Sequence, residues 1–265
     1  MNGSRESEIV KISEDFRDAK IDHVIIESPL SILIMHEDIQ YSMGLTMRTP
    51  GDDKSLVVGY LYSEGIIETI IDIQDIVSND NEILIVLNKS VEFNPSLHTR
   101  QDVTTSACGV CGKESLSNLD KLDRTRLDNS FLIDSNQVSS NLKSMMSNQP
   151  LFKITGGSHA AIAFSLEGDV IASAEDVGRH NALDKLIGIM LVKEQIPSNE
   201  AIIHVSGRAS YELVQKSIRA GFPILASVGA SSSMAVELAR EYNLTLISFL
   251  RTDSMVIHSA PNRIQ

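Results

Sequence analysis

The most reactive side chains in this sequence belong to two cysteines placed three positions apart. Cys108 and Cys111 are the only cysteines among 265 residues, and Gly109 and Gly112 give the pair a backbone that turns easily. A thiolate is a nucleophile and a metal ligand, so the pair suits a disulfide, half of a metal site, or the relay of sulfur to an acceptor. Two small residues packed in a core would show the same spacing, but the glycines favour an exposed loop.

The rest of the sequence weakens the metal interpretation. A structural zinc site needs about four ligands, and no second cysteine pair exists. The seven histidines are not paired at metal-ligand spacing, and the His-x-Glu tripeptide of zinc deaminases does not occur. No tightly held metal is therefore expected. A dithiol redox role stays open, although the pair is not clearly placed between a strand and a helix of a βαβ unit.

Three other motifs combine small residues with basic ones where a strand should end and a helix begin. They comprise residues 175–185, 206–210 and 228–233, and they contribute Arg179, His180 and Arg208. Basic groups and free backbone N–H groups at helix N-termini suit an anion such as phosphate. Each motif alone also fits a helix cap with a solvated face. Three such turns at one edge of a parallel sheet predict a ligand-binding edge.

The elements that must position these motifs fall into three parts. Residues 1–113 form a β-rich N-terminal region that ends in the cysteine loop, with expected strands at 23–27, 31–35, 39–48 and 82–87 and a helix from Asp52 or Asp53 to Gly65. Residues 114–150 are polar and read as a linker with a helix at 135–146. Residues 151–265 alternate strands (160–166, 170–174, 201–205, 224–228, 244–250) with helices (179–193, 209–220, 232–242), which predicts an α/β domain with parallel pairing.

Composition excludes several classes of protein. Hydrophobic residues make up 42% of the chain and charged residues 22%, as in a globular protein. A net charge of −12 disfavours binding to nucleic acid, although a local basic patch could hold one anionic ligand. No secretory signal and no membrane-spanning run is visible, so a reducing, cytoplasmic setting is expected.

Taken together, the motifs resemble the FdhD family of sulfurtransferases, the sulfur carriers required for formate dehydrogenase activity. The resemblance extends over residues 29–264 and rests on residues 106–115, 175–185 and 206–208, with shorter matches at 49–52, 63–65 and 249–251. It implies that a cysteine desulfurase supplies persulfide sulfur, which passes to the molybdenum (or tungsten) bis-molybdopterin guanine dinucleotide cofactor. That cofactor is bound as the acceptor substrate and then goes to formate dehydrogenase.

The resemblance also assigns roles to residues. It makes Cys108 the persulfide carrier and Cys111 an assisting thiol, and it implies a homodimer whose larger C-terminal domain is similar to the cytidine deaminase fold, with a smaller β-rich N-terminal domain. Its cofactor-binding stretch corresponds to Phe249, Leu250, Arg251, Thr252, Asp253 and Ser254, to which the basic turns add Arg208, Arg179 and His180. Where the family often has Ser-Ala-Pro-Thr, this chain has Gly229-Ala230-Ser231-Ser232, which leaves the rigidity of that turn open.

Two alternatives to the sulfurtransferase remain. A non-catalytic chaperone would bind the cofactor without using the thiols. A dithiol redox protein would need both Cys108 and Cys111 equally.

Overall fold

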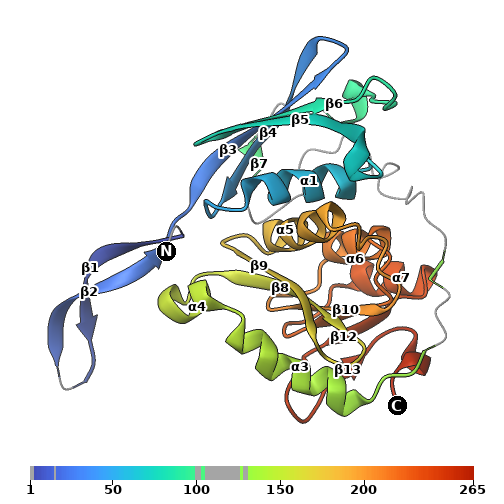
Figure 1. Cartoon of the computed structure of the whole chain (residues 1–265). Helices are drawn as coiled ribbons and strands as arrows, with labels where there is room; N and C mark the ends of the chain where they lie inside the picture. The colour runs from blue at the N-terminus through green and yellow to red at the C-terminus, as the bar shows by residue number, and fades with distance from the viewer. Residues whose placement is uncertain (1–2, 15, 99–102, 105–125, 128–130) are drawn as a thin grey trace.

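The computed structural model describes residues 3–14, 16–98, 103–104, 126–127 and 131–265. Within these ranges the chain forms a six-stranded sheet, a five-stranded sheet and a two-stranded hairpin. Helices α1 and α5 lie between the two larger sheets, and the hairpin projects from the side (Figure 1). No helix among the described residues is long and apolar enough to cross a membrane.

The N-terminal half builds the hairpin and the five-stranded sheet. Its elements are β1 (Ser4–Ile12), β2 (Arg17–Ile25), β3 (Ser28–His36), β4 (Ile39–Arg48), α1 (Asp53–Ser63), η1 (Ile70–Asp72), β5 (Ile73–Asn79), β6 (Glu82–Leu87), α2 (Pro95–His98) and β7 (Val103–Thr104). The sheet order is β5-β6-β3-β4-β7. Apolar residues alternate along β3, so Leu30, Ile32 and Ile34 are buried on the face toward α1.

Helix α1 begins at the expected aspartates. Asp52 occupies the N-cap position with φ 56°, but its side chain makes no capping hydrogen bond. Asp53 instead receives two hydrogen bonds of 2.9 Å from the buried Arg48 guanidinium at the end of β4. The predicted N-cap position of Asp52 is confirmed, although its side chain makes no capping hydrogen bond, and Asp53 ties the helix to the sheet.

The C-terminal half carries the six-stranded sheet. Its elements are α3 (Ser135–Ser147), α4 (Pro150–Thr155), β8 (His159–Ser165), β9 (Val170–Asp176), α5 (Arg179–Val192), β10 (Ala201–Val205), α6 (Tyr211–Arg219), β11 (Ile224–Ser227), α7 (Ser233–Glu241), β12 (Thr245–Ser248), β13 (Val256–Ile257) and η3 (Pro261–Arg263). The strand order is β13-β12-β11-β10-β8-β9. Strands β10, β11 and β12 are parallel, and β8 runs antiparallel to both β10 and β9. Strands β9 to β12 therefore all end at one edge.

Both faces of this sheet are covered, which explains its nearly continuous apolar strands. Ile203 and Val205 belong to the core shared with α5 and α6, whereas Ile202 packs with Val138 of α3. His204 also faces α3, where its Nε2 lies 3.1 Å from the Val138 carbonyl oxygen. Burial lowers the pKa of His204 to about 4, so this imidazole is neutral at pH 7 and serves to hold α3 on the sheet.

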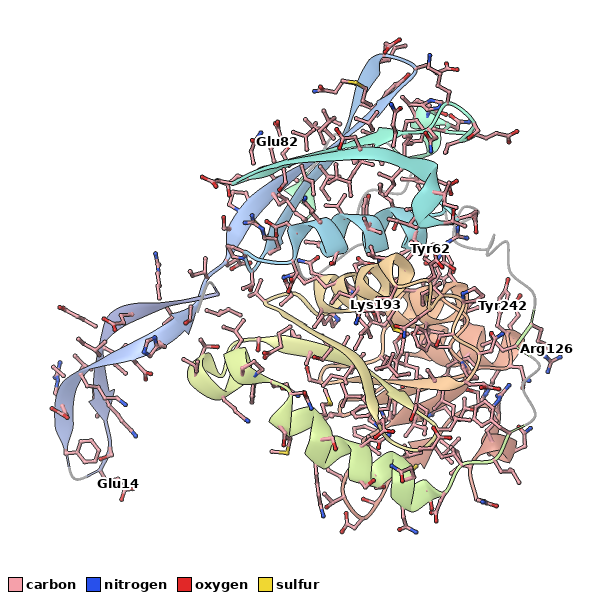
Figure 2. The ribbon with its side chains drawn as sticks, in the orientation of Figure 1. Glu14, Tyr62, Glu82, Arg126, Lys193 and Tyr242 are labelled. Carbon is pink, nitrogen blue, oxygen red and sulfur yellow. The ribbon has the colours of Figure 1, made fainter. Side chains whose placement is uncertain are left out.

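Two glycines allow helices α1 and α5, one from each half of the molecule, to pack closely. A Cβ added at Gly59 of α1 would lie 1.8 Å from the Asp184 carbonyl oxygen, and one added at Gly188 of α5 would lie 1.9 Å from the Ser55 carbonyl oxygen. The two helix backbones are therefore in contact. Tyr62, labelled in Figure 2 beside this junction, adds a hydrogen bond of 2.8 Å to the Arg219 carbonyl oxygen.

We expect Gly188→Ala to lower the free energy of unfolding by about 1–3 kcal/mol, because the new methyl group forces the α1 and α5 backbones apart. Urea titration monitored by circular dichroism measures the change. Lys54→Ala, on the exposed face of α1, is the matched control and should change stability by less than about 0.5 kcal/mol. Equal stability of Gly188→Ala and the control would contradict this close helix contact.

Candidate functional site

The turns singled out in the sequence meet at the carboxyl edge of β9 to β12. The Gly229 N–H donates to the Gly207 carbonyl oxygen at 3.0 Å, and the Phe249 N–H donates to the Gly229 carbonyl oxygen at 3.0 Å. The turns after β10, β11 and β12 are thus hydrogen-bonded to one another. For residues 206–210 and 228–233 this confirms the prediction that the turns line one edge of the sheet, and the turn after β12 joins them.

Glycine is required where the first two turns touch. A Cβ added at Gly229 would lie 2.8 Å from the Gly207 carbonyl oxygen and 2.9 Å from the Arg208 nitrogen. The turn at 229–232 is held by two hydrogen bonds to Ala209. The Ala209 N–H donates to the Ala230 carbonyl oxygen at 3.0 Å, and the Ala209 carbonyl oxygen accepts from the Ser232 N–H at 3.1 Å. This turn is therefore held in place without the proline that the family often has there.

The third turn begins with a strained residue. Phe249 has φ 51°, in the left-handed region that a side chain disfavours, and its ring is 47% exposed. Arg251 is exposed and donates from Nη1 to the Val228 carbonyl oxygen at 2.9 Å, so its guanidinium lies against the β11 turn. Leu250, by contrast, is fully buried in the core with Val138 and Ile202. Leu250 can therefore contact a ligand only where it lines the cavity described below.

His159 at the start of β8 joins the same edge. Its Nδ1 lies 3.4 Å from the Ser206 Oγ. A Cβ added at Gly207 would lie 3.3 Å from that nitrogen and 3.6 Å from the Arg179 Cδ, so the three residues are neighbours. Burial and, second, the positive charge of Arg179 lower the pKa of His159, which keeps the imidazole neutral at pH 7.

The other predicted basic residues have different surroundings. Arg208 is exposed and Arg179 is half-buried. His180 is buried, with its Nε2 3.0 Å from the Glu212 Oε2 and 3.2 Å from the Ser210 Oγ. His180 therefore holds α5 against the N-terminus of α6 and is less available to a ligand than the two arginines.

A cavity of about 480 Å³ opens at this edge, between the sheet and helices α3 and α4. One wall is apolar and comes from Leu142, Met145, Met146 and Phe152; the rest includes Gln149, Gly156, Gly157, Ser158, His159, Ser206, Val228, Leu250 and Arg251. Cavities of roughly 300–1,000 Å³ suit small ligands. An apolar wall facing hydrogen-bonding groups and a guanidinium suits a flat ring that carries an anionic group.

Only two of the predicted cofactor-binding residues, Leu250 and Arg251, line this cavity as the described residues form it. Phe249, Arg208 and Arg179 lie on neighbouring turns, and Thr252, Asp253 and Ser254 are exposed beyond Arg251. From the sequence, the segment 155–159 with His159 is interpreted as flexible and structural, and the cavity wall from α3 and α4 was missed. The sequence does contain a signal for His159. It directly precedes the expected strand 160–166, and the next expected strand, 170–174, is followed by the turn that contains Arg179.

Much of the polar motif 175–185 has a structural role. Asp176 is fully buried and accepts hydrogen bonds from the Thr49 N–H (3.1 Å) and the Asn181 Nδ2 (3.0 Å), and it pairs with the Lys185 Nζ at 2.8 Å. Lys185 also donates to the Thr49 carbonyl oxygen at 2.9 Å. These groups attach the loop after β4 to the six-stranded sheet, so for them the structural interpretation is the right one.

Glu175 stabilises a different contact. Its carboxylate accepts hydrogen bonds of 2.8 Å from the N–H groups of Leu151 and Phe152, at the start of α4, and one of 2.7 Å from the Ser158 Oγ. A carboxylate is well placed at the unsatisfied N–H groups of a helix start. Glu175 thereby fixes the helix that forms the cavity wall.

Cys108 and Cys111 lie outside the described residues. The chain before them is described as far as Thr104, which pairs with Thr46 in the contact of β7 with β4. The Thr46 Oγ1 donates to the Asn181 Oδ1 at 3.5 Å. Thr104 is therefore close to the first turn of α5, which begins with Arg179 and His180. Across the described parts of the chain, no three His, Cys, Asp or Glu side chains gather as a metal site would require.

Comparisons with known proteins agree along the whole chain. A profile of the FdhD/NarQ family matches residues 25–265. Proteins named "Sulfur carrier protein FdhD" are similar to this chain: that of Sulfurisphaera tokodaii is 41% identical over 97% of each chain, and that of Picrophilus torridus is 41% identical over 94% of this chain and 95% of its own. A crystal structure described as a formate dehydrogenase accessory protein from Desulfotalea psychrophila superimposes with a TM-score of 0.79 at 26% identity, over 99% of both chains.

Proposed function

Because this chain belongs to the FdhD/NarQ family, we propose that it is a sulfur carrier in the maturation of formate dehydrogenase. In this proposal it acts in the cytoplasm as a sulfurtransferase. Cys108 receives a persulfide sulfur from a cysteine desulfurase and transfers it to the molybdenum bis-molybdopterin guanine dinucleotide cofactor, which is bound as the acceptor substrate. Its activity as a homodimer and the similarity of its C-terminal half to the cytidine deaminase fold are part of the same proposal.

The observation that carries the proposal is the sheet edge with its cavity. The turns that bear Arg208 and Arg251 are both hydrogen-bonded to the turn after β11, beside a cavity of about 480 Å³ with one apolar wall, and Arg179 lies next to Gly207. The acceptor cofactor combines flat heteroaromatic rings with pyrophosphates, so it needs both kinds of surface. The arginines provide local positive charge in a chain whose net charge is −12.

The described chain that leads to Cys108 ends close to this edge. Cys108 follows Thr104 by four positions, and four residues of extended chain span at most about 14 Å. Thr104 pairs with Thr46, which is hydrogen-bonded to Asn181 in the first turn of α5. The last described residue before Cys108 therefore lies next to the helix that begins with Arg179, which supports the proposal that Cys108 serves this edge.

Loading of the carrier is an exchange between two sulfur centres. The Cys108 thiolate attacks the outer sulfur of the desulfurase persulfide, a new S–S bond forms at Cys108, and the desulfurase leaves as its thiolate. One S–S bond forms as another breaks, so the exchange needs no separate oxidant or reductant. The reaction requires a thiolate that is accessible to both the donor and the acceptor, as expected for Cys108.

We expect Arg251→Ala to weaken the binding of GDP, a surrogate for the nucleotide end of the cofactor, by about 10- to 100-fold, because a charge-assisted hydrogen bond contributes about 1.5–3 kcal/mol. Isothermal titration calorimetry measures this affinity. Arg240→Ala is the matched control, since Arg240 is exposed in the last turn of α7, away from the strand ends. If wild type failed to bind GDP, or if both variants bound it equally well, the proposed site would be wrong.

A further inference from the structure

The hairpin of β1 and β2 is an arm that projects from the body of the molecule (Figure 1). Nine residue pairs join its strands without a bulge, from Ser4 with Ile25 to Ile12 with Arg17. Figure 2 places Glu14 at its tip, far from the larger sheets. Contact with the body is at the base, where Ile25 packs against Gly157. Nearly all of the arm precedes residues 25–265, the part that the family profile matches.

The two faces of the arm differ in chemistry. Directly paired residues of antiparallel strands point to the same side. Val10, Ile12 and Ile21 therefore share one face, which we call the apolar arm face, and they are 52%, 69% and 63% exposed. Ala19 on this face is exposed too. The opposite face has the charged residues Arg5, Lys11, Asp18, Lys20 and Asp22, together with Ser7, Ile9 and Val24.

Such an arm is an incomplete structure. A two-stranded hairpin is marginally stable by itself in water, and an antiparallel sheet usually packs its apolar face on other protein. In this chain Ile25 at the base is half-buried against the body, and the same face continues outward uncovered. The arrangement indicates an interaction surface.

The charges on the apolar arm face indicate which partner fits. Glu6 lies toward the base, paired with His23, and Glu8 lies at the middle of the arm, whereas Arg17 lies at the tip. When two copies of this face pack about a two-fold axis with the arms antiparallel, the tip of one arm meets the base half of the other. Arg17 of each copy then lies near the glutamates of the other copy, so the face is complementary to itself.

We propose that the apolar arm face is the surface through which this chain forms a dimer. Val10, Ile12 and Ile21 of each copy pack against the same residues of the second copy, and the Arg17–glutamate pairs set the antiparallel orientation. The inference takes up the homodimer of the proposed function and names its interface, but it does not depend on sulfur transfer.

Sedimentation velocity over a range of protein concentrations tests the interface. We expect wild type to dimerise and the double variant Ile12→Asp/Ile21→Asp to dimerise about 100-fold more weakly or worse, since it loses two apolar contacts and places carboxylates in the interface. The matched control is Ile71→Asp, at an isoleucine that is 75% exposed in η1, and it should dimerise like wild type. A circular dichroism melt of each variant confirms that the body is folded.

A charge exchange tests the orientation separately. Arg17→Glu should weaken the dimer, and combining it with Glu6→Arg and Glu8→Arg should restore the affinity. A wild type that is monomeric at every concentration, or a dimer unchanged in Ile12→Asp/Ile21→Asp, would overturn the proposal. Loss of binding to formate dehydrogenase in that variant with no change in mass would assign the surface to the enzyme instead. Sulfur loading of Cys108, measured in the same samples, shows whether the proposed function fails independently.

Discussion

A Cys108→Ser variant should lose the ability to activate formate dehydrogenase, while a Cys111→Ser variant keeps the ability to accept sulfur. Serine has nearly the shape of cysteine, but it provides no thiolate to attack a persulfide. We expect the activity restored to an extract that lacks this protein to fall below about a thousandth of the wild-type value, as for other lost nucleophiles. Formate oxidation by the reconstituted enzyme measures the effect.

The two cysteine variants separate the sulfur carrier from its alternatives. A non-catalytic chaperone that only binds the cofactor would remain active in Cys108→Ser. A dithiol redox protein would be damaged equally by Cys108→Ser and Cys111→Ser, because a disulfide needs both thiols. The expected pattern, loss of loading at the first position only, fits neither alternative.

Asp176→Ala should lower the free energy of unfolding by about 3–5 kcal/mol, because it leaves the buried Lys185 ammonium without its paired charge. Asp176 has no exposed surface, and its carboxylate also accepts hydrogen bonds from Thr49 and Asn181. The loss should release the loop after β4 from the six-stranded sheet. Chemical denaturation measures the change, and faster proteolysis near Thr49 would accompany it.

Two further variants keep this prediction specific. Asp169→Ala, at an exposed aspartate in the turn before β9, should leave stability within about 0.5 kcal/mol of wild type. Asp176→Asn combined with Lys185→Met removes both charges but keeps hydrogen-bonding groups for Thr49 and Asn181. It should be more stable than Asp176→Ala. An Asp176→Ala variant as stable as Asp169→Ala would show that the buried pair does not join the halves.

The strands and helices of the C-terminal half could be predicted because their burial leaves a clear sequence pattern. Strand β10 is buried on both faces and is apolar except for His204, and the turns after it contain the small residues that close backbone contact requires. The convergence of these turns followed from parallel pairing alone. The exact ends shifted by a few residues, as for α6, which spans Tyr211–Arg219 where 209–220 was expected.

The elements that were missed have weak local signals. Strand β1 contains charged residues on both faces, with Arg5 and Lys11 on one and Glu6 and Glu8 on the other, and it contacts the body only near its base. No strict alternation of apolar and polar residues therefore marks it. Helix α4 is only six residues long and owes its position to Glu175, which is distant in sequence. The cavity could not be predicted for the same reason, since the apolar wall from α3 depends on how this helix lies across the sheet. No local pattern specifies that contact.

For the polar motif 175–185 the sequence suggested more ligand-binding groups than the structure provides. Its density of charged groups predicted a ligand site, but Asp176 and Lys185 pair with each other and with Thr49 in the contact between the two halves. Arg179 alone of its basic residues is half-buried at the sheet edge beside His159. A sequence shows which groups are present, whereas the partner of each buried charge emerges only from the fold.

The central claim is that Cys108 carries sulfur, and mass spectrometry tests it most directly. The protein is incubated with a cysteine desulfurase and cysteine, its free thiols and persulfides are alkylated, and the peptide that contains both cysteines is fragmented. We predict the mass of one additional sulfur atom on Cys108 in wild type and in Cys111→Ser, and none in Cys108→Ser. An unmodified wild-type protein, or the same adduct in Cys108→Ser, would contradict the account.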